Sequence, residues 1–595
     1  MLLYVAFIVY NDDYTPLTFA ITLLGLVSSV TLLYVVFYII LIPFSFTKKI
    51  ILYLAGMIFV VANIALVVDF FIYRLFNFHI NAMVLNILTS PDAMDSIQVG
   101  IVPLITFILL IIGFIGFEIY LLKRLNNTAP KEKECLNTKW NKRVVLPLIL
   151  VVLSEKFGYG FADLFSKYEI VSKFEVIPLY QPLTFTHIAA KYFGFKPEKQ
   201  AKYSIKIKAA LNYPLEPLKI NHEVKKFNIF IIASDSVKYS ILNDKIAPNL
   251  AKFKQEALSF DHHYSGGNAT RFGIFSLIYG LNATYWFSFL NAHQRPVLFD
   301  VLKQLGYHID IISSTNTNWP EFRKTCYVDI QSSIHDKFEG KPWEKDAQST
   351  HCFMQRVEED AKENKPIFSF TFLDAPHGYS YPPKSNQYGA DGGEVNYLSI
   401  TKESDALKNL IKCYKNAVHY DDMLFGKMIA KLKEQGLYEN ALVIYTADHG
   451  QEFFEYGHFG HNSSFSKAQI HVPLMIKLPQ FLQEKGFANR INTSMTSHQD
   501  IVPTLLSLLG VSNDPSVYSN GKNFFAKGFK RDYVFSANWN SNAIVTPKYS
   551  YLFSNLPNKI FNNEVRDRNY QRITGKRIPS KLIVDVMNEN KKFLK

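Results

Sequence analysis

Cysteine is scarce in this chain. Only four cysteines occur among its 595 residues, and they are scattered at Cys135, Cys326, Cys352 and Cys413. This scarcity excludes a disulfide framework and a thiolate metal site, both of which need more cysteines at short spacings. If the second half of the chain lies outside the cytoplasm, Cys326 and Cys352 are the pair to test for a bridge, with free buried thiols as the alternative.

The sequence also lacks the signatures of nucleic-acid binding. It has no zinc-finger spacing, no basic helix with interleaved heptads and no aromatic RNA-binding signature. Lysine and arginine (64) nevertheless outnumber aspartate and glutamate (51), which gives a formal net charge of +13. We therefore expect no nucleic-acid partner, and we assign the basic excess to an anionic lipid surface.

Long apolar runs fill the chain before about residue 165. A helix that spans a bilayer needs roughly 20 mostly apolar residues, and the segments 17–45, 50–73, 99–122 and 144–163 reach or approach that length. The opening MLLYVAFIVY has the composition of the end of a fifth span, without the basic region and cleavage site of a removed signal peptide. The sequence thus predicts a bundle of five transmembrane helices in residues 1–163.

Basic residues gather in two of the loops between these segments. Lys48 and Lys49 follow the segment 17–45, and further lysines and arginines fill residues 123–143, whereas residues 75–98 contain none. Basic loops stay on the cytoplasmic side. The pattern therefore predicts that everything after about residue 165 lies on the other side of the membrane.

Residues 164–226 form a basic, aromatic juxtamembrane linker. Such a segment beside a membrane suits the phosphates of anionic lipids, although a solvated face is the alternative. The lysines that we expect to bind lipid are Lys167, Lys173, Lys191, Lys202, Lys206 and Lys208.

From residue 227 to 595, short continuous apolar runs alternate with amphipathic helical windows, which is typical of buried parallel strands with crossover helices. We predict strands at 227–234, 307–313, 366–373, 441–446 and 471–477, and helices near 247–258, 271–278, 296–305, 403–434 and 499–509. The fold class is therefore α/β with a mostly parallel central sheet. The asparagine- and lysine-rich C-terminus predicts a poorly ordered tail.

Two of these predicted strands end in metal-ligand residue types. The run FNIFIIAS leads directly into Asp235, and a second strand leads into Asp448-His449-Gly450. Because sites in open α/β sheets form at the carboxyl ends of the strands, these side chains are expected to converge. Aspartate beside histidine suits zinc or manganese better than calcium.

A hydroxyl group stands near the start of a predicted helix. In the segment SGGNATRFGIFSLIYG, Gly266 and Gly267 precede Thr270, and the helix begins at or just after it. Next to a metal, such a hydroxyl can become a nucleophile that also faces the oriented N–H groups of the helix. An ordinary helix N-cap is the alternative role.

Together these residues resemble the alkaline-phosphatase and sulfatase superfamily, whose members share a first-strand acidic ligand, a nucleophile on a following helix and a late Asp-His-Gly. In sulfatases the nucleophile is a modified Cys or Ser with a glycine ten positions on. Here Thr270 takes that place and Gly280 follows ten positions later. Threonine there is similar to the phosphoethanolamine transferases and lipoteichoic-acid synthases, which are membrane-anchored and handle phospholipid headgroups.

The whole chain resembles the YejM/PbgA family of inner-membrane proteins. The resemblance rests on the predicted anchoring helices and on the segments INAMVLNILTSPDAMDS, SGGNATRFGIFSLIYGL and TSHQDIVPTLLSLLGV. It implies a multi-pass protein of the bacterial inner membrane with a periplasmic C-terminal domain. Similarity to the lipid-headgroup transferases adds Ala-Pro-His377-Gly as a substrate contact, and His458 or His461 as a further site histidine.

These observations predict a membrane-anchored, metal-dependent hydrolase or phosphotransferase that acts on phosphate esters of lipid headgroups, in lipopolysaccharide or cardiolipin homeostasis. One or two divalent ions (Zn, Mn or Mg) would be held by Asp235, Thr270, Asp448 and His449, with Thr270, His377 and either His458 or His461 catalytic. Expected partners are membrane phospholipid or lipid A, with a membrane or cytoplasmic regulatory protein also possible. The alternatives are a non-catalytic lipid-binding regulator on the same fold and a true sulfatase.

Overall fold

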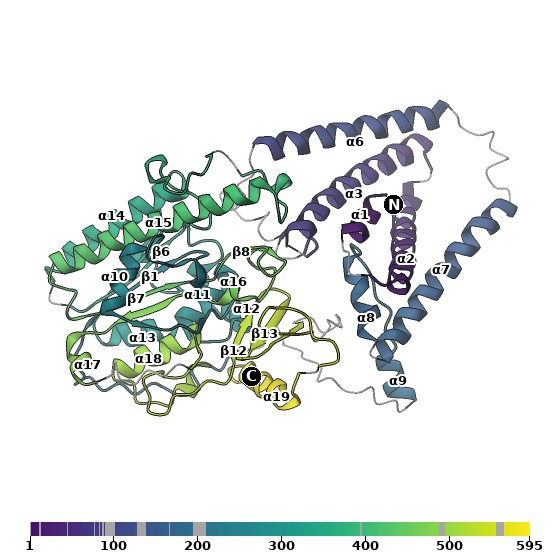
Figure 1. The fold of residues 1–595 in the computed structure, drawn as a ribbon. Coiled ribbons are helices and arrows are strands. Elements are labelled where there is room, and N and C mark those ends of the chain that lie inside the picture. The colour runs from purple at the N-terminus through teal and green to yellow at the C-terminus, as the bar shows by residue number, and fades with distance from the viewer. Residues whose placement is uncertain are drawn as a thin grey trace.

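A computed structural model describes residues 2–10, 14–44, 46–76, 78–81, 84–85, 89, 101–127, 138–165, 167–193, 210–363, 365–392, 395–486, 494–554, 564–576 and 578–595. The N-terminal part consists of long helices, and an α/β part lies beside it (Figure 1).

Four helices in the described residues are long and apolar enough to cross a membrane. They are α2 (Pro16–Leu41), α3 (Lys48–Phe76), α6 (Ile101–Asn127) and α7 (Thr138–Leu164). Helix α1 (Leu2–Tyr10) has nine residues, too few to span a bilayer. It packs near the C-terminal end of α3, where the Phe7 and Phe70 rings lie 5.3 Å apart. Where the sequence predicts five spans, the structure therefore describes four and one short helix.

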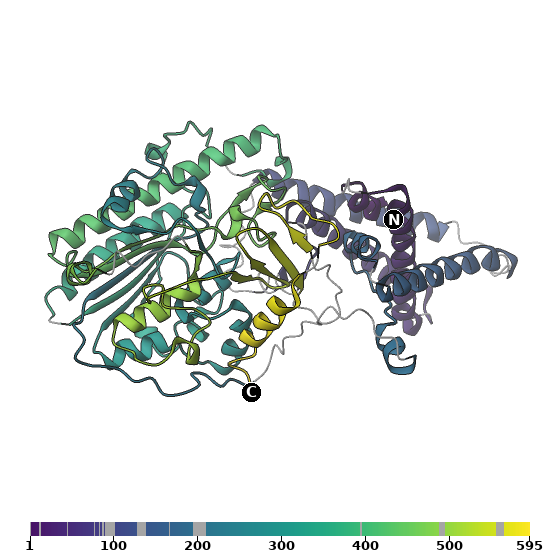
Figure 2. The same cartoon turned by 60° about the horizontal axis from the view of Figure 1, so that its bottom comes forward.

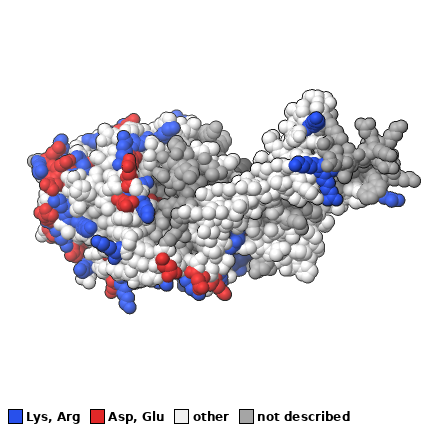
Figure 3. Space-filling view, turned by 90° about the horizontal axis from the view of Figure 1, so that it is seen from above, with Lys and Arg blue, Asp and Glu red and all other residues white. Residues whose placement is uncertain are grey.

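Charged side chains are distributed in the way that a membrane requires. Figure 3 shows them over the α/β part and at the far end of the helical part, with an uncharged stretch between. The membrane helices also expose large apolar side chains, such as Met57, Val61 and Phe117. A belt of this kind is stable only against hydrocarbon.

The predicted linker 164–226 divides between the two parts. Its first half contains α8 (Tyr168–Val171), the 3-10 turn Ser172–Val176 and α9 (Thr186–Tyr192). Phe174 and Ile177 are buried there in one cluster with Tyr159 of α7. Its last residues instead pair with the α/β part through the bridges Leu211–Leu594 and Ile220–Val511.

Three of the lysines expected to bind lipid are described. Lys167 and Lys191 are exposed, and the Lys173 ammonium lies 5.3 Å from the centre of the Tyr14 ring. The other three lie outside the described residues: Lys202, Lys206 and Lys208.

The α/β part is built on a seven-stranded sheet in the order β2-β10-β7-β1-β6-β4-β5. Strands β1, β4, β5, β6 and β7 are parallel, and β10 runs antiparallel to β7 and β2. The strands are β1 (Asn228–Ser234), β2 (Leu258–Ser259), β4 (His308–Ser313), β5 (Ile334–His335), β6 (Ile367–Leu373), β7 (Ala441–Ala447) and β10 (Leu474–Lys477). A mostly parallel sheet is the predicted fold class, which is confirmed.

Helices cover both faces of this sheet (Figures 1 and 2). Side chains alternate along β1, so Phe230 and Ile232 pack on one face and Ile229 and Ile231 on the other. The first face is covered by α10 (Pro248–Glu256), α14 (Pro342–Asp360) and α15 (Asp405–Glu434). The second is covered by α11 (Thr270–Tyr279), α12 (Trp286–Ala292), α13 (Val297–Gln304) and α18 (Ile501–Leu508).

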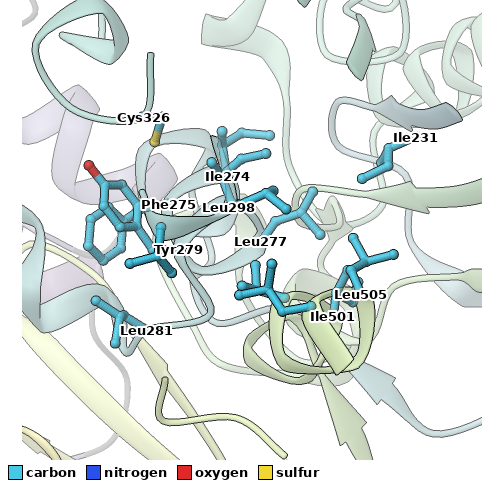
Figure 4. Packing of buried hydrophobic residues seen from close by; sticks show 14 of the residues in the cluster. Ile231, Ile274, Phe275, Leu277, Tyr279, Leu281, Leu298, Cys326, Ile501 and Leu505 are labelled. Carbon is cyan, nitrogen blue, oxygen red and sulfur yellow. The ribbon is translucent and has the colours of Figure 1, made fainter. Parts of the chain in front are cut away.

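Helix α11 is buried in the core of the second face. Figure 4 shows Ile274, Leu277 and Tyr279 of α11 among Leu298 and residues of α18. Burial on all sides fixes the position of its first residue, Thr270, relative to the sheet.

The cysteines contribute no disulfide among the described residues. Cys326 is buried in the core of the second face, whereas Cys352 on α14 packs against the first face, and both thiols are free. The sheet separates the two, so the bridge considered from the sequence does not form in this structure.

A second, four-stranded antiparallel sheet follows in the C-terminal region. It consists of β12 (Val534–Ala537), β13 (Ser541–Val545), β14 (Ser550–Ser554) and β15 (Glu564–Arg566). The remaining short elements are β3 (His263–Tyr264), β8 (Glu452–Phe453), β9 (Phe459–Gly460), β11 (Thr496–Ser497), α16 (Lys467–Ile470) and α17 (Gln480–Glu484).

The prediction of a poorly ordered C-terminal tail is wrong. Residues Ser580–Glu589 form α19, and Val586 and Phe593 are both fully buried in the main core. The backbone N–H of Lys595 donates a 2.8 Å hydrogen bond to the Ala210 carbonyl. The prediction rested on the average composition of this segment, which is polar. Its apolar residues are spaced so that they form one buried face of a helix.

Candidate active site

Three neighbouring parallel strands deliver polar side chains to one edge of the sheet. Asp235 follows β1, Asp374 follows β6, and Asp448-His449 follows β7. Parallel strands place their carboxyl ends together, so these groups meet although up to 214 positions separate them in the chain. The expected convergence of Asp235, Asp448 and His449 is present: one ligand atom from each lies within 4.8 Å of the others.

Thr270, the first residue of α11, faces this edge. Its hydroxyl lies 3.2 Å from a carboxylate oxygen of Asp235 and 3.2 Å from Nε2 of His449. Thr270 is not an N-cap, because that position belongs to Ala269. The hydroxyl therefore has two polar neighbours able to accept its proton, and it stands at a helix N-terminus, where negative charge is favoured.

Close packing holds α11 against β7. A Cβ added at Gly273 would come within 2.2 Å of the Asp448 carbonyl oxygen, so only glycine permits this approach. Gly280 ends the helix in the left-handed region at φ +68°, which glycine adopts without strain.

The imidazole of His449 presents an unprotonated nitrogen to the site. Its Nδ1 lies 3.0 Å from the Gly450 carbonyl oxygen, which can only accept, so Nδ1 carries the proton. Burial lowers the pKa of this fully buried ring. Nε2 is left with a lone pair that points toward Thr270 and Asp448.

The donor set fits a divalent cation. Asp448 is fully buried, and its Oδ2 has no hydrogen-bond partner within the described residues, although it lies 3.3 Å from His449 Nε2. Burial and the neighbouring Asp235 carboxylate raise the pKa of Asp448 well above its usual range. A divalent cation between the two carboxylates would offset both effects, and two oxygens with one imidazole suit such an ion.

His377 reaches the same centre from the loop after β6. Its Nδ1 lies 3.2 Å from Asp235 Oδ1 and 3.3 Å from the hydroxyl of Ser236. Burial alone would lower the pKa of His377, but the carboxylates of Asp235, Asp374 and Asp448 raise it to about 10. Asp235, Asp374 and His377 form a second group of possible metal ligands.

The structure places His461, rather than His458, at this centre. The His461 ring lies 4.5 Å from that of His449 and 5.1 Å from that of His377, measured between ring centres. Its Nδ1 lies 3.0 Å from Oε1 of Gln451. His458 instead lies beside Tyr570, and its backbone N–H donates to the Glu452 carboxylate.

Sequence reasoning missed three polar residues of this centre. The Ser236 hydroxyl donates to Asp235 at 2.7 Å, Gln451 orients His461, and Asp374 adds a carboxylate. Asp374 follows an apolar strand directly, as Asp235 does, so the same rule applied to 366–373 finds it. Ser236 and Gln451 carry no such signal.

A third group of possible ligands, His308, Asp310 and Asp360, lies elsewhere on β4 and α14. The guanidinium of Arg356 already bonds to all three, at 2.8 to 3.2 Å. The guanidinium already balances the negative charge of the two aspartates, so we assign no metal to this group.

Two family models match the chain. Residues 2–220 match a domain of unknown function, DUF3413, and residues 227–511 match the sulfatase family. The two matches meet where the membrane part joins the α/β part.

Known proteins are similar to the chain over most of its length. An uncharacterized protein of Haemophilus influenzae is 24% identical over 492 residues, which cover 81% of this chain and 74% of that protein. The inner membrane protein YejM of Salmonella typhi is 22% identical over 572 residues, which cover 95% of this chain and 89% of that protein. A solved structure of an alkaline phosphatase superfamily protein from Vibrio parahaemolyticus covers 66% of this chain and 91% of its own, with 19% identity and a TM-score of 0.45.

The two family matches agree with the architecture of apolar helices followed by an α/β part. The similarity to YejM and the apolar helices also support a location in the inner membrane. The chain is therefore similar to the inner membrane protein YejM over nearly all of its length, with a DUF3413 match in its membrane part followed by a match to the sulfatase family in its α/β part.

Proposed function

We propose that this protein is a metal-dependent hydrolase or phosphotransferase that acts on phosphate esters of membrane-lipid headgroups, with Thr270 as its nucleophile. The observation that carries the proposal is the position of the Thr270 hydroxyl, 3.2 Å from both Asp235 and His449 at the start of a buried helix. A hydroxyl in that position has proton acceptors beside it and helix N–H groups in front of it.

In the proposed reaction, the Thr270 oxygen forms a bond to phosphorus while the bond from phosphorus to the leaving alcohol breaks. The Thr270 proton passes to a neighbouring acceptor. His461 lies beside both His449 and His377, so His461 and His377 are placed to donate hydrogen bonds to the transferring phosphoryl group or to the departing oxygen. Water or a second lipid then accepts the phosphoryl group from the threonine.

Asp235, Asp448 and His449 would hold a divalent cation, with Asp374 and His377 available for a second. Such a cation supplies positive charge that lowers the pKa of the hydroxyl and polarises a phosphoryl oxygen.

A lipid substrate follows from the position of the domain on its anchor. The basic loops at residues 48–49 and 123–143 would lie in the cytoplasm, so the sulfatase domain would lie on the periplasmic side. The exposed Lys167 and Lys191 lie between the last membrane helix and the domain, where the phosphates of phospholipid or lipid A are found.

The proposal is tested on the full-length protein in nanodiscs. We expect bound zinc or manganese, and release of phosphate from p-nitrophenyl phosphate that stops on chelation. Thr270→Ala should lower kcat roughly 10³-fold or more. Thr270→Ser should retain part of the activity, and Thr401→Ala, which removes an exposed threonine, should retain all of it.

Phosphate release that persists in Thr270→Ala would remove Thr270 as the nucleophile. Turnover of p-nitrophenyl sulfate in preference to the phosphate would favour a sulfatase. No bound metal and no turnover of either ester would leave a lipid-binding regulator on a sulfatase fold.

A further inference from the structure

The end of a membrane helix lies inside the core of the sulfatase domain. We call the last three residues of α3, Arg74, Leu75 and Phe76, the α3 tip. Leu75 is only 9% exposed, although most of the apolar side chains that precede it in α3 are half-buried or exposed. It belongs to one buried cluster with Val237, Tyr379, Phe453 and Phe459 of the sulfatase domain.

Two further contacts fix the α3 tip. The Arg74 guanidinium donates a 3.0 Å hydrogen bond to the Ile400 carbonyl, just before α15. The Phe76 ring lies 6.5 Å from the Phe459 ring, between centres, and a Cβ added at Gly460 would come within 3.0 Å of Phe76. Helix α3 therefore touches the backbone of β9 itself, near β8 in Figure 1.

The segments that the α3 tip contacts are those that carry the site. Val237 lies two residues after Asp235, and Tyr379 lies two residues after His377. Phe459 and Gly460 form β9, which ends immediately before His461. The tip thus packs behind three of the four loops that converge on Thr270.

His461 depends most directly on this packing. It is held from one side by β9, which pairs with β8 through Phe453–Phe459 and Glu452–Gly460. From the other side it is held by Gln451, which bonds to His461 and donates to the Tyr379 hydroxyl. Both β9 and Tyr379 belong to, or adjoin, the cluster that Leu75 completes.

We propose that Leu75 and Phe76 are positioning residues of the active site: the α3 tip holds the β8–β9 hairpin in place and, through it, the ring of His461. The membrane helix is then a structural part of the site, and a displacement of α3 in the bilayer displaces His461. The expected effect on catalysis rests on the proposed function, but the role of the α3 tip in holding the β8–β9 hairpin does not.

The test is hydrogen exchange in the full-length protein in nanodiscs of phosphatidylethanolamine and phosphatidylglycerol. In Phe76→Ala, we expect amide exchange in residues 452–461 to become about tenfold faster, with exchange in β1 and β7 unchanged. Phe76→Leu keeps an apolar side chain and should restore most of the protection. Phe117→Ala makes the same truncation in another membrane helix, where the side chain is 58% exposed. It should leave amide exchange in residues 452–461 unchanged.

Unchanged exchange in the hairpin of Phe76→Ala would overturn the inference. An equal rise in β1 and β7 would also overturn it, because the α3 tip would then support the whole domain rather than the hairpin. If the wild type turns over phosphate esters, Phe76→Ala should lower kcat more than it changes KM. Faster hairpin exchange in a protein without turnover would end the proposed function and leave the positioning role standing.

Discussion

At the scale of single residues, the site combines two buried carboxylates with too few protein donors to satisfy them. Asp235 accepts hydrogen bonds from Ser236 and Thr270, but Oδ2 of Asp448 has no such donor among the described residues. An uncompensated buried charge is costly, so a divalent cation bound between the two carboxylates would stabilise the arrangement.

Asp448→Asn should therefore have opposite effects with and without metal. Zinc or manganese at 100 times its dissociation constant should raise the free energy of unfolding of the wild type by about 2.7 kcal/mol. The same metal should raise that of the variant only slightly. In a chelator, the variant should unfold at the same or a higher temperature, because it lacks the repulsion from Asp235. Thermal unfolding in both buffers checks this, and a variant that gains as much from metal as the wild type would contradict it.

Two other buried histidines predict a pH dependence of stability. His263 and His498 are fully buried, their rings lie 5.2 Å apart, and Nε2 of each lacks a partner among the described residues. Burial lowers the pKa of His263 well below 6.5 and that of His498 to about 4. The unfolded chain therefore binds protons first, so their contribution is intact above about pH 6.5 and is lost as the pH falls toward 4.

Denaturant unfolding between pH 7 and pH 4.5 measures this loss. Each histidine contributes a slope of up to about 1.4 kcal/mol per pH unit. His498→Gln should flatten the profile, and His222→Gln, at an exposed position, should not. A wild-type stability that is constant across this range would contradict the assignment.

At the scale of elements, the position of Thr270 depends on the contact between α11 and β7. Gly273→Ala would place a methyl group 2.2 Å from the Asp448 carbonyl oxygen, which is backbone and cannot yield easily. We expect a loss of about 1–3 kcal/mol in stability and a larger loss in kcat, because α11 carries Thr270 away from Asp235. Gly116→Ala, with nothing within 4 Å, is the control, and equal activity of both variants would argue against the contact.

The C-terminal segment, α19 and the residues after it, belongs to the core, so shortening a buried side chain there should lower the stability. Phe593 is fully buried between Tyr213 and Tyr285, with ring centres at 5.4 and 5.7 Å. Phe593→Ala should lower the free energy of unfolding by about 3–5 kcal/mol. Lys591→Ala, at an exposed neighbour, should leave it unchanged, and a small effect of Phe593→Ala would restore the interpretation as a loose tail.

Five strands of the central sheet could be predicted from the sequence because they are continuous apolar runs, whereas the two-residue edge strands β2 and β5 were not predicted. A strand such as β1 or β7 is a continuous apolar run, and its end is marked by the aspartate that follows. The four strands β12–β15 were not predicted, because they are short and pair only with one another. The same contrast holds in the site, where Asp235, Asp448 and His449 carry a signal in their strands and Ser236 and Gln451 do not.

At the scale of the whole molecule, the membrane part and the sulfatase domain are not independent. From hydrophobicity alone, residues 50–73 are predicted to span the membrane. Nothing in that pattern indicates that Leu75 is buried in the core of a domain more than 150 residues away in the chain. Contacts at that separation follow from the tertiary fold. The isolated sulfatase domain would expose part of that core, so its stability and activity should be measured in the full chain.

The proposed function requires that Thr270 becomes covalently phosphorylated during turnover. The most direct measurement is mass spectrometry of peptides from full-length protein, quenched in acid during steady-state turnover of a phosphate ester in nanodiscs. We expect a phosphoryl group on Thr270 in the wild type, and no modified residue in that peptide in Thr270→Ala. Turnover at a normal rate with no phosphoryl group on Thr270 at any quench time, or with the group on another residue, would contradict it.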